Sequence, residues 1–296
     1  MRHFPGATAY ITGGSSGIGL STAKLLAAHG AHVIIFARDK KRLEEARIAI
    51  EGRRISDHQR FASAQVDVAR AEQVEKVMEQ AVAAFGVPDL LINCAGRACP
   101  RCFEDISYRQ FDETMKINLY GAWNTIKALV PHMKRAGGGG AIVNVSSMAG
   151  LIGVFGYADY AASKFALIGL SEVLRSELKP YRIHVSVLCP PDTDTPGFEA
   201  ENLTKPPETK AVSSAARLMH PDAVAAALLR GVKKGSFLIV PNVESTLAFL
   251  AKRLYPSLVE RYMDRAIEKT RREQGGDRSE DGSPGTERPA THPRRG

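Results

Sequence analysis

The chain has 296 residues, a length that fits one α/β domain with an appendage. Hydrophobic residues make up 44% and charged residues 24% of it, which is ordinary globular usage and excludes wholesale disorder, a collagen-like repeat and a coiled coil. Forty Lys and Arg against 32 Asp and Glu leave a net charge of +8, which suits nucleic acid, a membrane face or a phosphorylated cofactor, or simply reflects an Arg-rich proteome.

Short apolar runs alternate with helical stretches along the chain. Strands are predicted at 7–11, 32–36, 61–66, 90–93, 141–145, 183–188 and 237–240. Helices are predicted at 18–29, 39–50 with Asp39 as N-cap, 72–85, 108–135 with a break near Tyr120-Gly121, 157–178 and 222–232. This alternation predicts an α/β fold: a Rossmann-like, doubly wound parallel sheet with helices on both faces.

Three segments interrupt the alternation. Residues 190–212 are rich in Pro, Thr, Asp and Glu and predict a long loop with at most a short helix. Residues 243–272 favour a helix that Pro256 kinks or splits. We therefore expect a single catalytic domain at 1–241, a helical C-terminal extension at 242–274 and a disordered tail at 275–296.

No signal peptide or membrane span is expected. The N-terminus lacks a long apolar stretch, and the uncharged segment 136–158 is full of Gly, Ser and Asn. A buried strand and an active-site loop explain that segment better, so the sequence predicts a soluble, cytoplasmic protein. Cys99 and Cys102 form a CPRC stretch without a second pair or clustered His, which favours reduced surface thiols over a metal or redox site.

The segment TGGSSGIG, from Thr12 to Gly19, follows a predicted strand and opens a predicted helix. Glycines allow a tight turn and let the backbone approach a phosphate, and the helix N-terminus offers free N–H groups to it. This context favours binding of a dinucleotide cofactor, although a glycine-rich turn alone is weak support for it.

Tyr160 and Lys164 stand four residues apart in YAASK, on one face of a predicted helix. A cation beside a phenol should lower the pKa of the tyrosine, which could then exchange a proton with a substrate oxygen near neutral pH. Ser147 lies thirteen residues upstream in NVSSMAG, and Asn118 lies in KINLYG. With the TGxxxGxG spacing, this set resembles the short-chain dehydrogenase/reductase family over roughly residues 7–241.

The resemblance implies roles for these residues. Tyr160 would be the catalytic acid or base, and Lys164 would tune it and hold the nicotinamide ribose. Ser147 would orient the carbonyl group, and Asn118 would anchor a water molecule that leads to Lys164. Ser146 is the rival for the serine role, and the spacing to Tyr160 favours Ser147.

Further matches to the family imply cofactor contacts. Asn93-Cys94-Ala95-Gly96 resembles the NNAG turn with Cys94 in place of Asn, and Asp67 matches the acidic residue near the adenine ring. Pro190–Thr195 stands where the family has PGxxxT, with Pro191 in place of Gly. The expected cofactor-binding residues are Gly13, Ser15, Ser16, Gly17, Ile18, Gly19, Arg38, Asp67, Val68, Asn93, Ala95, Gly96, Tyr160, Lys164, Pro190, Thr193 and Thr195.

NADPH is the expected cofactor. An acidic residue at the end of the second strand would bind the ribose 2′-hydroxyl of NAD and repel a 2′-phosphate. The chain instead places Arg38 there, followed by Lys40, Lys41 and Arg42. Asp39 argues for NAD, but it is better explained as a helix cap.

The loop PPDTDTPGFEAENLTKPPETK resembles the corresponding stretch of the 3-ketodihydrosphingosine reductase group of the family. The implied reaction is NADPH-dependent reduction of the ketone of 3-ketosphinganine to sphinganine. Asp192 and Asp194 could recognise the ammonium group of that substrate, or they could merely cap a helix and solvate the loop. Two alternatives are a reductase for another ketone, such as a 3-oxoacyl thioester or a steroid, and a non-catalytic binding protein. No nucleic-acid motif accompanies the charge.

The C-terminal stretch combines apolar and basic residues. Such a helix could lie on a membrane surface, as on the cytosolic face of the endoplasmic reticulum, or pack on the core or on a dimer partner. The resemblance also implies a homo-oligomer formed through the helix at 157–178. The apolar residues are Leu247, Phe249, Leu250, Leu254, Tyr255, Leu258 and Val259, and the flanking basic residues are Lys252, Arg253, Arg261 and Arg265.

Overall fold

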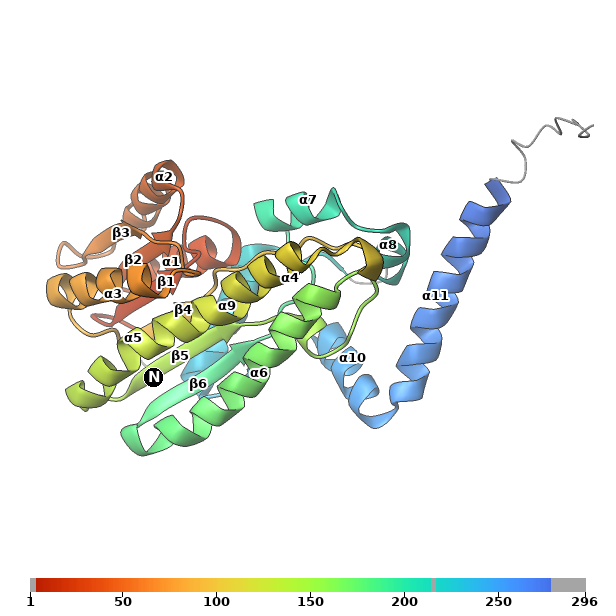
Figure 1. Cartoon of the computed structure of the whole chain (residues 1–296). Coiled ribbons are helices and arrows are strands. Elements are labelled where there is room, and N and C mark those ends of the chain that lie inside the picture. The colour runs from red at the N-terminus through yellow and green to blue at the C-terminus, as the bar shows by residue number, and fades with distance from the viewer. Residues whose placement is uncertain (1–3, 214–216, 278–296) are drawn as a thin grey trace, which may run out of the picture.

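Seven parallel strands form one sheet in the order β3-β2-β1-β4-β5-β6-β7 in the computed structural model (Figure 1), which describes residues 4–213 and 217–277. Most of the strands are buried, as expected of a parallel sheet that is covered on both faces. All seven predicted strands are present: β1 (Thr8–Thr12), β2 (His32–Ala37), β3 (Phe61–Gln65), β4 (Leu90–Asn93), β5 (Gly140–Val145), β6 (Ile183–Leu188) and β7 (Leu238–Ile239).

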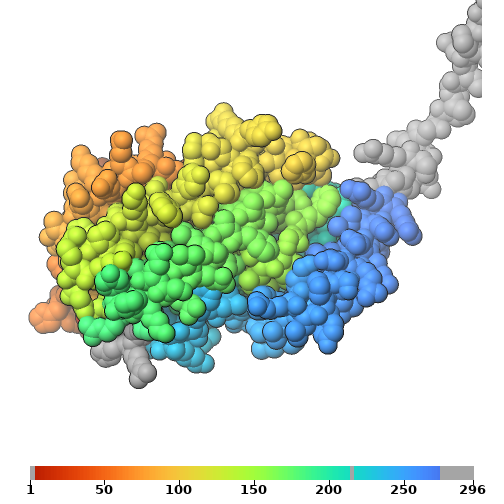
Figure 2. Space-filling view, turned by 60° about the horizontal axis from the view of Figure 1, so that its bottom comes forward, coloured from red at the N-terminus to blue at the C-terminus, as the bar shows by residue number. Residues whose placement is uncertain are grey.

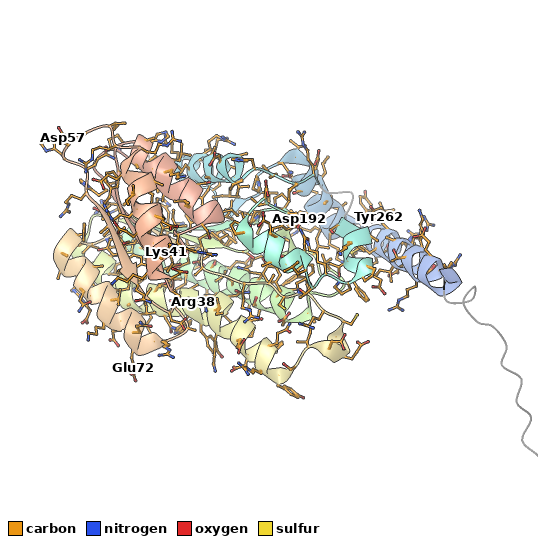
Figure 3. All side chains as sticks on the ribbon, turned by 90° about the horizontal axis from the view of Figure 1, so that it is seen from above. Arg38, Lys41, Asp57, Glu72, Asp192 and Tyr262 are labelled. Atoms are coloured by element: carbon orange, nitrogen blue, oxygen red, sulfur yellow. The ribbon has the colours of Figure 1, made fainter. Side chains whose placement is uncertain are left out.

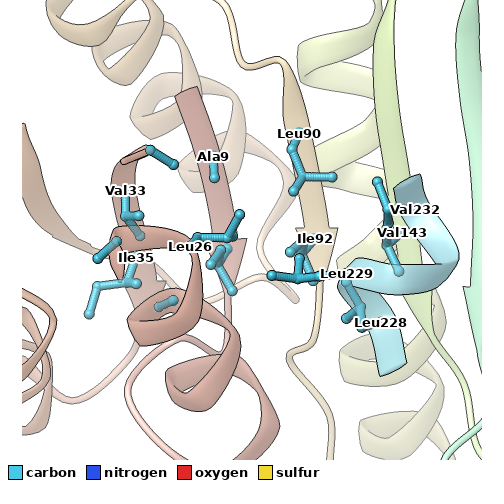
Figure 4. Close-up of a cluster of buried hydrophobic side chains, with 14 of the residues drawn as sticks. Ala9, Leu26, Val33, Ile35, Leu90, Ile92, Val143, Leu228, Leu229 and Val232 are labelled. Atoms are coloured by element: carbon cyan, nitrogen blue, oxygen red, sulfur yellow. The ribbon is translucent and has the colours of Figure 1, made fainter. Parts of the chain in front are cut away.

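Helices cover both faces of the sheet, so the doubly wound fold is confirmed. On one face lie α1 (Gly17–Ala28), α2 (Lys40–Glu51) and α9 (Pro221–Lys234), and Figure 4 shows Leu26, Leu228 and Leu229 packing there onto β-strand side chains such as Val33 and Ile92. The other face is covered by α3 (Ala71–Phe85), α5 (Gly121–Ala136) and α6 (Ala158–Leu178). The predicted cap Asp39 accepts a hydrogen bond from the Arg42 N–H over 3.0 Å.

A π turn interrupts the predicted helix at 108–135. Helix α4 (Tyr108–Met115) ends there, Lys116–Tyr120 form the π turn, and α5 begins at Gly121. Helix α4 packs on α6, whereas α5 packs on α3. The break predicted near Tyr120-Gly121 is therefore present, and π turns of this kind are frequent at functional sites.

The carboxyl ends of the central strands meet at one edge of the sheet. Thr12 at the end of β1 pairs with Asn93 of β4, which pairs with Asn144 of β5. The Thr12 hydroxyl oxygen accepts hydrogen bonds from the Cys94 and Ala95 N–H groups, at 3.2 and 3.4 Å. The chain reverses its direction of growth between β1 and β4, and in such sheets ligands bind in the crevice at this point.

The predicted loop at 190–212 contains two short helices, α7 (Pro196–Asn202) and α8 (Pro207–Ser213). The C-terminal stretch is split at Pro256, as predicted, into α10 (Val243–Leu254) and α11 (Pro256–Asp277). Figure 2 shows these two helices in blue at one end of the molecule. Helix α11 packs on α8, and Arg271 pairs with Glu208 at 3.2 Å. The short helical turns are Phe103–Asp105, Met148–Gly150 and Lys179–Tyr181.

Helix α11 continues three residues into the segment predicted to be a disordered tail, and the rest of that segment lies outside the described residues. None of the helices in the described part of the chain is long and apolar enough to cross a membrane.

Candidate active site

A cavity of about 660 Å³ lies at the carboxyl edge of the sheet. The glycine-rich turn after β1, the ends of β4 and β5, and the loop after β6 contribute to its walls, and α7 and the start of α10 line the rest. Ser147, Tyr160 and Lys164 all line this cavity together with Gly13, Ser16, Gly17 and Ile18. Residues from separate stretches of the sequence therefore share one site, which brings together the predicted Ser147, Tyr160 and Lys164.

Two glycines of the turn are required by its geometry. Gly13 has a φ of 67°, and a Cβ there would lie 2.8 Å from the Ala95 backbone nitrogen. Gly17 has a φ of 51°, and a Cβ there would lie 2.9 Å from Cγ2 of Thr195. Only glycine suits positive φ angles in such tight surroundings. The turn thus presents bare backbone to the cavity.

The N-terminus of α1 faces the same cavity. Ser16 is its N-cap residue, but the serine side chain makes no capping hydrogen bond, and no acidic residue lies in the first turn. The first N–H groups of the helix and its positive dipole end are thus available to an anion. Together with the glycine turn, they fit the pyrophosphate of a dinucleotide.

Arg38 follows β2 and is exposed, and its carbonyl oxygen accepts a 2.7 Å hydrogen bond from the Gln65 side chain. Figure 3 shows Arg38 and Lys41 near the start of α2. Because Asp39 caps α2, its carboxylate is already used by the helix. The Arg38 side chain therefore remains available to bind a phosphate group of the cofactor.

Tyr160 and Ser147 both line the cavity, and the Ser147 hydroxyl is close enough to act on the pKa of the tyrosine, which it lowers. Ser147 also caps a short helical turn, where its hydroxyl oxygen accepts from the Ala149 N–H over 3.1 Å. The neighbouring Ser146 is buried, and its hydroxyl donates to the Lys164 carbonyl oxygen at 3.0 Å. Ser147 thus faces the tyrosine, whereas Ser146 supports the backbone of α6.

The Lys164 side chain is buried, and its ammonium group donates a 2.9 Å hydrogen bond to the Val145 carbonyl oxygen. It lies 5.5 Å from the centroid of the Tyr160 ring. Burial lowers the pKa of Lys164 to about 8. The lysine can therefore carry or lose its charge near physiological pH.

The expectation that Lys164 lowers the pKa of Tyr160 is not met. Burial raises that pKa above its usual value, the Ser147 hydroxyl opposes this increase, and the carboxylates of Glu201 and Asp192 add to it. Desolvation of the phenolate outweighs the favourable interactions. Tyr160 therefore holds its proton at neutral pH.

Asn118 lies in the π turn and is fully buried. Its side-chain oxygen accepts from the Arg97 N–H over 2.9 Å, and its amide group donates to the Arg97 carbonyl and to the Ser163 hydroxyl. A Cβ on Gly96 would lie 3.3 Å from this oxygen and 3.4 Å from the Lys164 nitrogen. Asn118 and Lys164 therefore flank the same glycine.

Asn93 does not contribute its side chain to the cavity. Its amide donates to the Asn144 side-chain oxygen over 2.9 Å, and its own oxygen accepts from the Thr125 hydroxyl over 2.6 Å. This buried network ties β4 to β5 and α5. A cofactor contact at Asn93 would therefore have to come from its backbone, and the predicted contact stays a prediction.

Asp67 and Val68 lie beyond β3. The Asp67 carboxylate accepts from the Ala69 N–H at 3.1 Å, and the Val68 carbonyl accepts from the Asn124 amide at 2.9 Å. Neither residue is among those that line the cavity, and the same holds for Ser15, Gly19, Arg38 and Asn118. Their predicted cofactor and catalytic roles are left as predictions.

The loop after β6 is held by its own threonines. The Pro190 carbonyl accepts from the Met148 N–H, and the Thr193 hydroxyl donates to the Pro191 carbonyl over 2.8 Å. Thr195 caps α7 by accepting from the Phe198 N–H. Asp194 is exposed and lies outside the residues that line the cavity, so the structure gives no support to it as a substrate contact.

The structure also contains a polar cluster that was not predicted from the sequence. Its members are Tyr157, Asp192, Glu201 and Lys205. The Tyr157 hydroxyl donates to Glu201, and the Lys205 ammonium lies 3.1 Å from the same carboxylate and 3.6 Å from that of Asp192. The four-residue spacing of Glu201 and Lys205 was a possible signal, but it falls in a segment predicted to be a loop.

All four cysteines are free. Cys99 lies 3.9 Å from the Thr204 hydroxyl, and no group of His, Cys, Asp and Glu in residues 4–213 and 217–277 could hold a metal ion.

A protein-family model described as short chain dehydrogenase matches residues 7–206. The chain is 43% identical over 233 residues to 3-dehydrosphinganine reductase of Danio rerio, covering 78% of this chain and 70% of the relative. It is 42% identical over 234 residues to 3-ketodihydrosphingosine reductase of Bos taurus, covering 79% and 70%. The solved structure of L-sorbose reductase from Gluconobacter frateurii, complexed with NADPH and L-sorbose, is similar at a TM-score of 0.71 and 26% identity, covering 81% of this chain and 96% of that one.

Proposed function

The chain belongs to the short-chain dehydrogenase family, and we propose that it reduces the ketone of 3-ketosphinganine to sphinganine with NADPH as the reductant. The observation that carries the proposal is the joint placement of Ser147, Tyr160 and Lys164 in one cavity with the glycine-rich turn and the loop after β6. Relatives that are named for this reaction, at 43% and 42% identity, support the choice of substrate.

When NADPH is bound, its nicotinamide supplies the hydride that the carbonyl carbon accepts. The protein supplies the proton. Tyr160 keeps its phenolic proton at neutral pH, which is the form needed to protonate the developing alkoxide. Ser147 lines the same cavity as the tyrosine and would hold the carbonyl oxygen beside it. The buried Lys164 gives the phenolate that remains a nearby positive charge.

NADPH is preferred over NADH in this proposal because an exposed Arg38 follows β2 and the carboxylate of the next residue, Asp39, caps a helix. The cofactor pyrophosphate would lie on Gly13 to Gly19 at the start of α1. The other residues expected at the cofactor are part of this proposal, and Asn93 would act through its backbone.

Peripheral membrane contact is a further part of the proposal. Helices α10 and α11 expose Leu247, Leu250, Leu254 and Leu258, and the basic residues Lys252 and Arg253 lie among them. A long-chain substrate could then reach the site from a membrane surface, such as the cytosolic face of the endoplasmic reticulum in a eukaryote. Co-sedimentation with anionic vesicles tests the contact.

A homo-oligomer formed through α6 is also proposed, and analytical ultracentrifugation tests it. The exposed Phe165 and Val173 of that helix would lie in the interface.

NADPH oxidation with 3-ketosphinganine, compared with an acetoacetyl thioester and with a steroid ketone, tests the function. Turnover of 3-ketosphinganine at least ten times more efficient than that of either other ketone is expected. A preference for one of the other ketones would overturn the substrate assignment. If the protein reduced none of the three ketones, the proposed chemistry would be wrong.

A further inference from the structure

The polar cluster of Tyr157, Asp192, Glu201 and Lys205 contains two carboxylates and one ammonium group. Lys205 is almost completely buried, with its side chain 2% exposed, and lies 3.1 Å from Glu201 and 3.6 Å from Asp192. Its nitrogen also lies 4.1 Å from the centroid of the Phe198 ring. One positive charge therefore faces two negative charges, which leaves the cluster with one excess negative charge.

This excess charge is directed toward the reacting group. Asp192, Glu201 and Tyr157 all line the same cavity as Tyr160, and the centroids of the two tyrosine rings are 5.6 Å apart. The carboxylates of Glu201 and Asp192 are also among the groups that raise the pKa of Tyr160. Their field thus reaches the position where the carbonyl oxygen of a substrate must lie.

The Glu201 and Asp192 side chains are only 14% and 30% exposed, so water screens their charge incompletely and a cation placed beside them would be favoured. Lys205 cannot supply the missing charge, because its ammonium already lies between the two carboxylates. The Tyr157 hydroxyl donates to Glu201 and holds that carboxylate at the cavity wall. A neutral substrate would offer these two carboxylates no cation.

We infer that Glu201 is a specificity-determining residue of this site and, with Asp192, selects substrates that carry a cationic amine next to the reacting ketone. The inference rests on the proposed function, since 3-ketosphinganine carries its amine on the carbon beside the ketone. The cation would also offset the carboxylates at Tyr160, so the correct substrate would ease proton transfer.

The test compares kcat/KM for 3-ketosphinganine with that for 1-hydroxyoctadecan-3-one, which has the same chain without the amine. Hydrogen bonds between charged groups are the strongest of their kind, so Glu201→Gln should lower the ratio of the two values by about 10- to 100-fold. Asp192→Asn should lower the same ratio. Glu199→Gln, an exposed neighbour on α7, should leave the ratio within about twofold, as expected of an exposed site.

An unchanged ratio in both Glu201→Gln and Asp192→Asn would overturn the inference, and so would an equal loss on both substrates in these variants with unchanged thermal unfolding. If the wild type reduces the neutral ketone but not 3-ketosphinganine, the proposed function fails instead. In that case the inference is tested by inhibition of neutral-ketone reduction, with decylamine compared with decanol. Decylamine should inhibit the wild type more strongly than decanol does. In Glu201→Gln the two compounds should inhibit equally.

Discussion

The ammonium nitrogen of Lys164 lies 2.9 Å from the carbonyl oxygen of Val145, so the lysine of α6 is tied to the last residue of β5. This hydrogen bond holds the charged group at the carboxyl edge of the sheet, in surroundings that are almost closed to water. The hydrogen bond only partly replaces hydration, and the pKa of Lys164 falls to about 8.

Replacing Lys164 with Met should change how stability depends on pH. The pKa of this lysine is lower in the folded than in the unfolded chain, so burial of its charge costs stability below about pH 8. Between about pH 8 and about pH 10.5 the lysine is neutral in the folded chain but still protonated in the unfolded chain. The free energy of unfolding of the wild type should therefore increase with pH over this range, relative to that of Lys164→Met, by up to about 3 kcal/mol.

Urea unfolding of both proteins at several pH values measures this difference. Lys179→Met, which removes an exposed lysine at the end of α6, serves as the control and should show no such trend. A stability difference that stays constant over this pH window would contradict the prediction.

Tyr160→Phe removes the hydroxyl group that donates the proton and keeps the ring. We expect kcat to fall about 10²- to 10⁴-fold, which is the usual contribution of a general acid. NADPH affinity, measured by the fluorescence of the bound cofactor, should change little. A variant that retains a tenth of the wild-type rate would show that another group supplies the proton.

Gly96→Ala should disturb the site more than the fold. The added methyl group would lie 3.3 Å from the Asn118 oxygen and 3.4 Å from the Lys164 nitrogen, so both groups must move by a few tenths of an ångström. Because catalysis is sensitive to small displacements, kcat should fall about tenfold or more. Gly153→Ala is the matched control, since a Cβ there has no neighbour within 4 Å among the described atoms.

Arg38→Asp should reverse the cofactor preference. A carboxylate at the end of β2 repels a 2′-phosphate and can accept a hydrogen bond from the 2′-hydroxyl of NADH. The KM for NADPH should rise about 10- to 100-fold, while that for NADH stays the same or falls. Arg53→Asp, an exposed residue after α2, controls for the change in net charge. An unchanged preference would refute the assignment of NADPH.

The sheet could be predicted from local patterns because its strands are short apolar runs between strong helix signals. The cap at Asp39 and the split at Pro256 are also local, and both are confirmed. The juxtaposition of Ser147, Tyr160 and Lys164 was correct because parallel strands bring their carboxyl ends to one edge.

The errors arose where distant residues decide the outcome. The motif that contains Asn93 did not reveal that the side-chain amide of this residue binds Asn144 and Thr125, which are 51 and 32 residues away. The pKa of Tyr160 depends on burial and on Glu201, neither of which the YAASK motif encodes. The ion pairs of Lys205 with Glu201 and Asp192 depend on how the loop after β6 folds, which the composition of the loop does not reveal.

The π turn at Lys116–Tyr120 holds one residue more per turn than an α-helix does. The helices on either side are thereby rotated out of phase by about 100°. One continuous run of sequence can then direct polar residues such as Thr114 toward Asp159 of α6 before the turn and its apolar side toward α3 after it. Deletion of a single residue here would restore the phase and would swing Asn118 away from Lys164, so the length of this segment is as constrained as its composition.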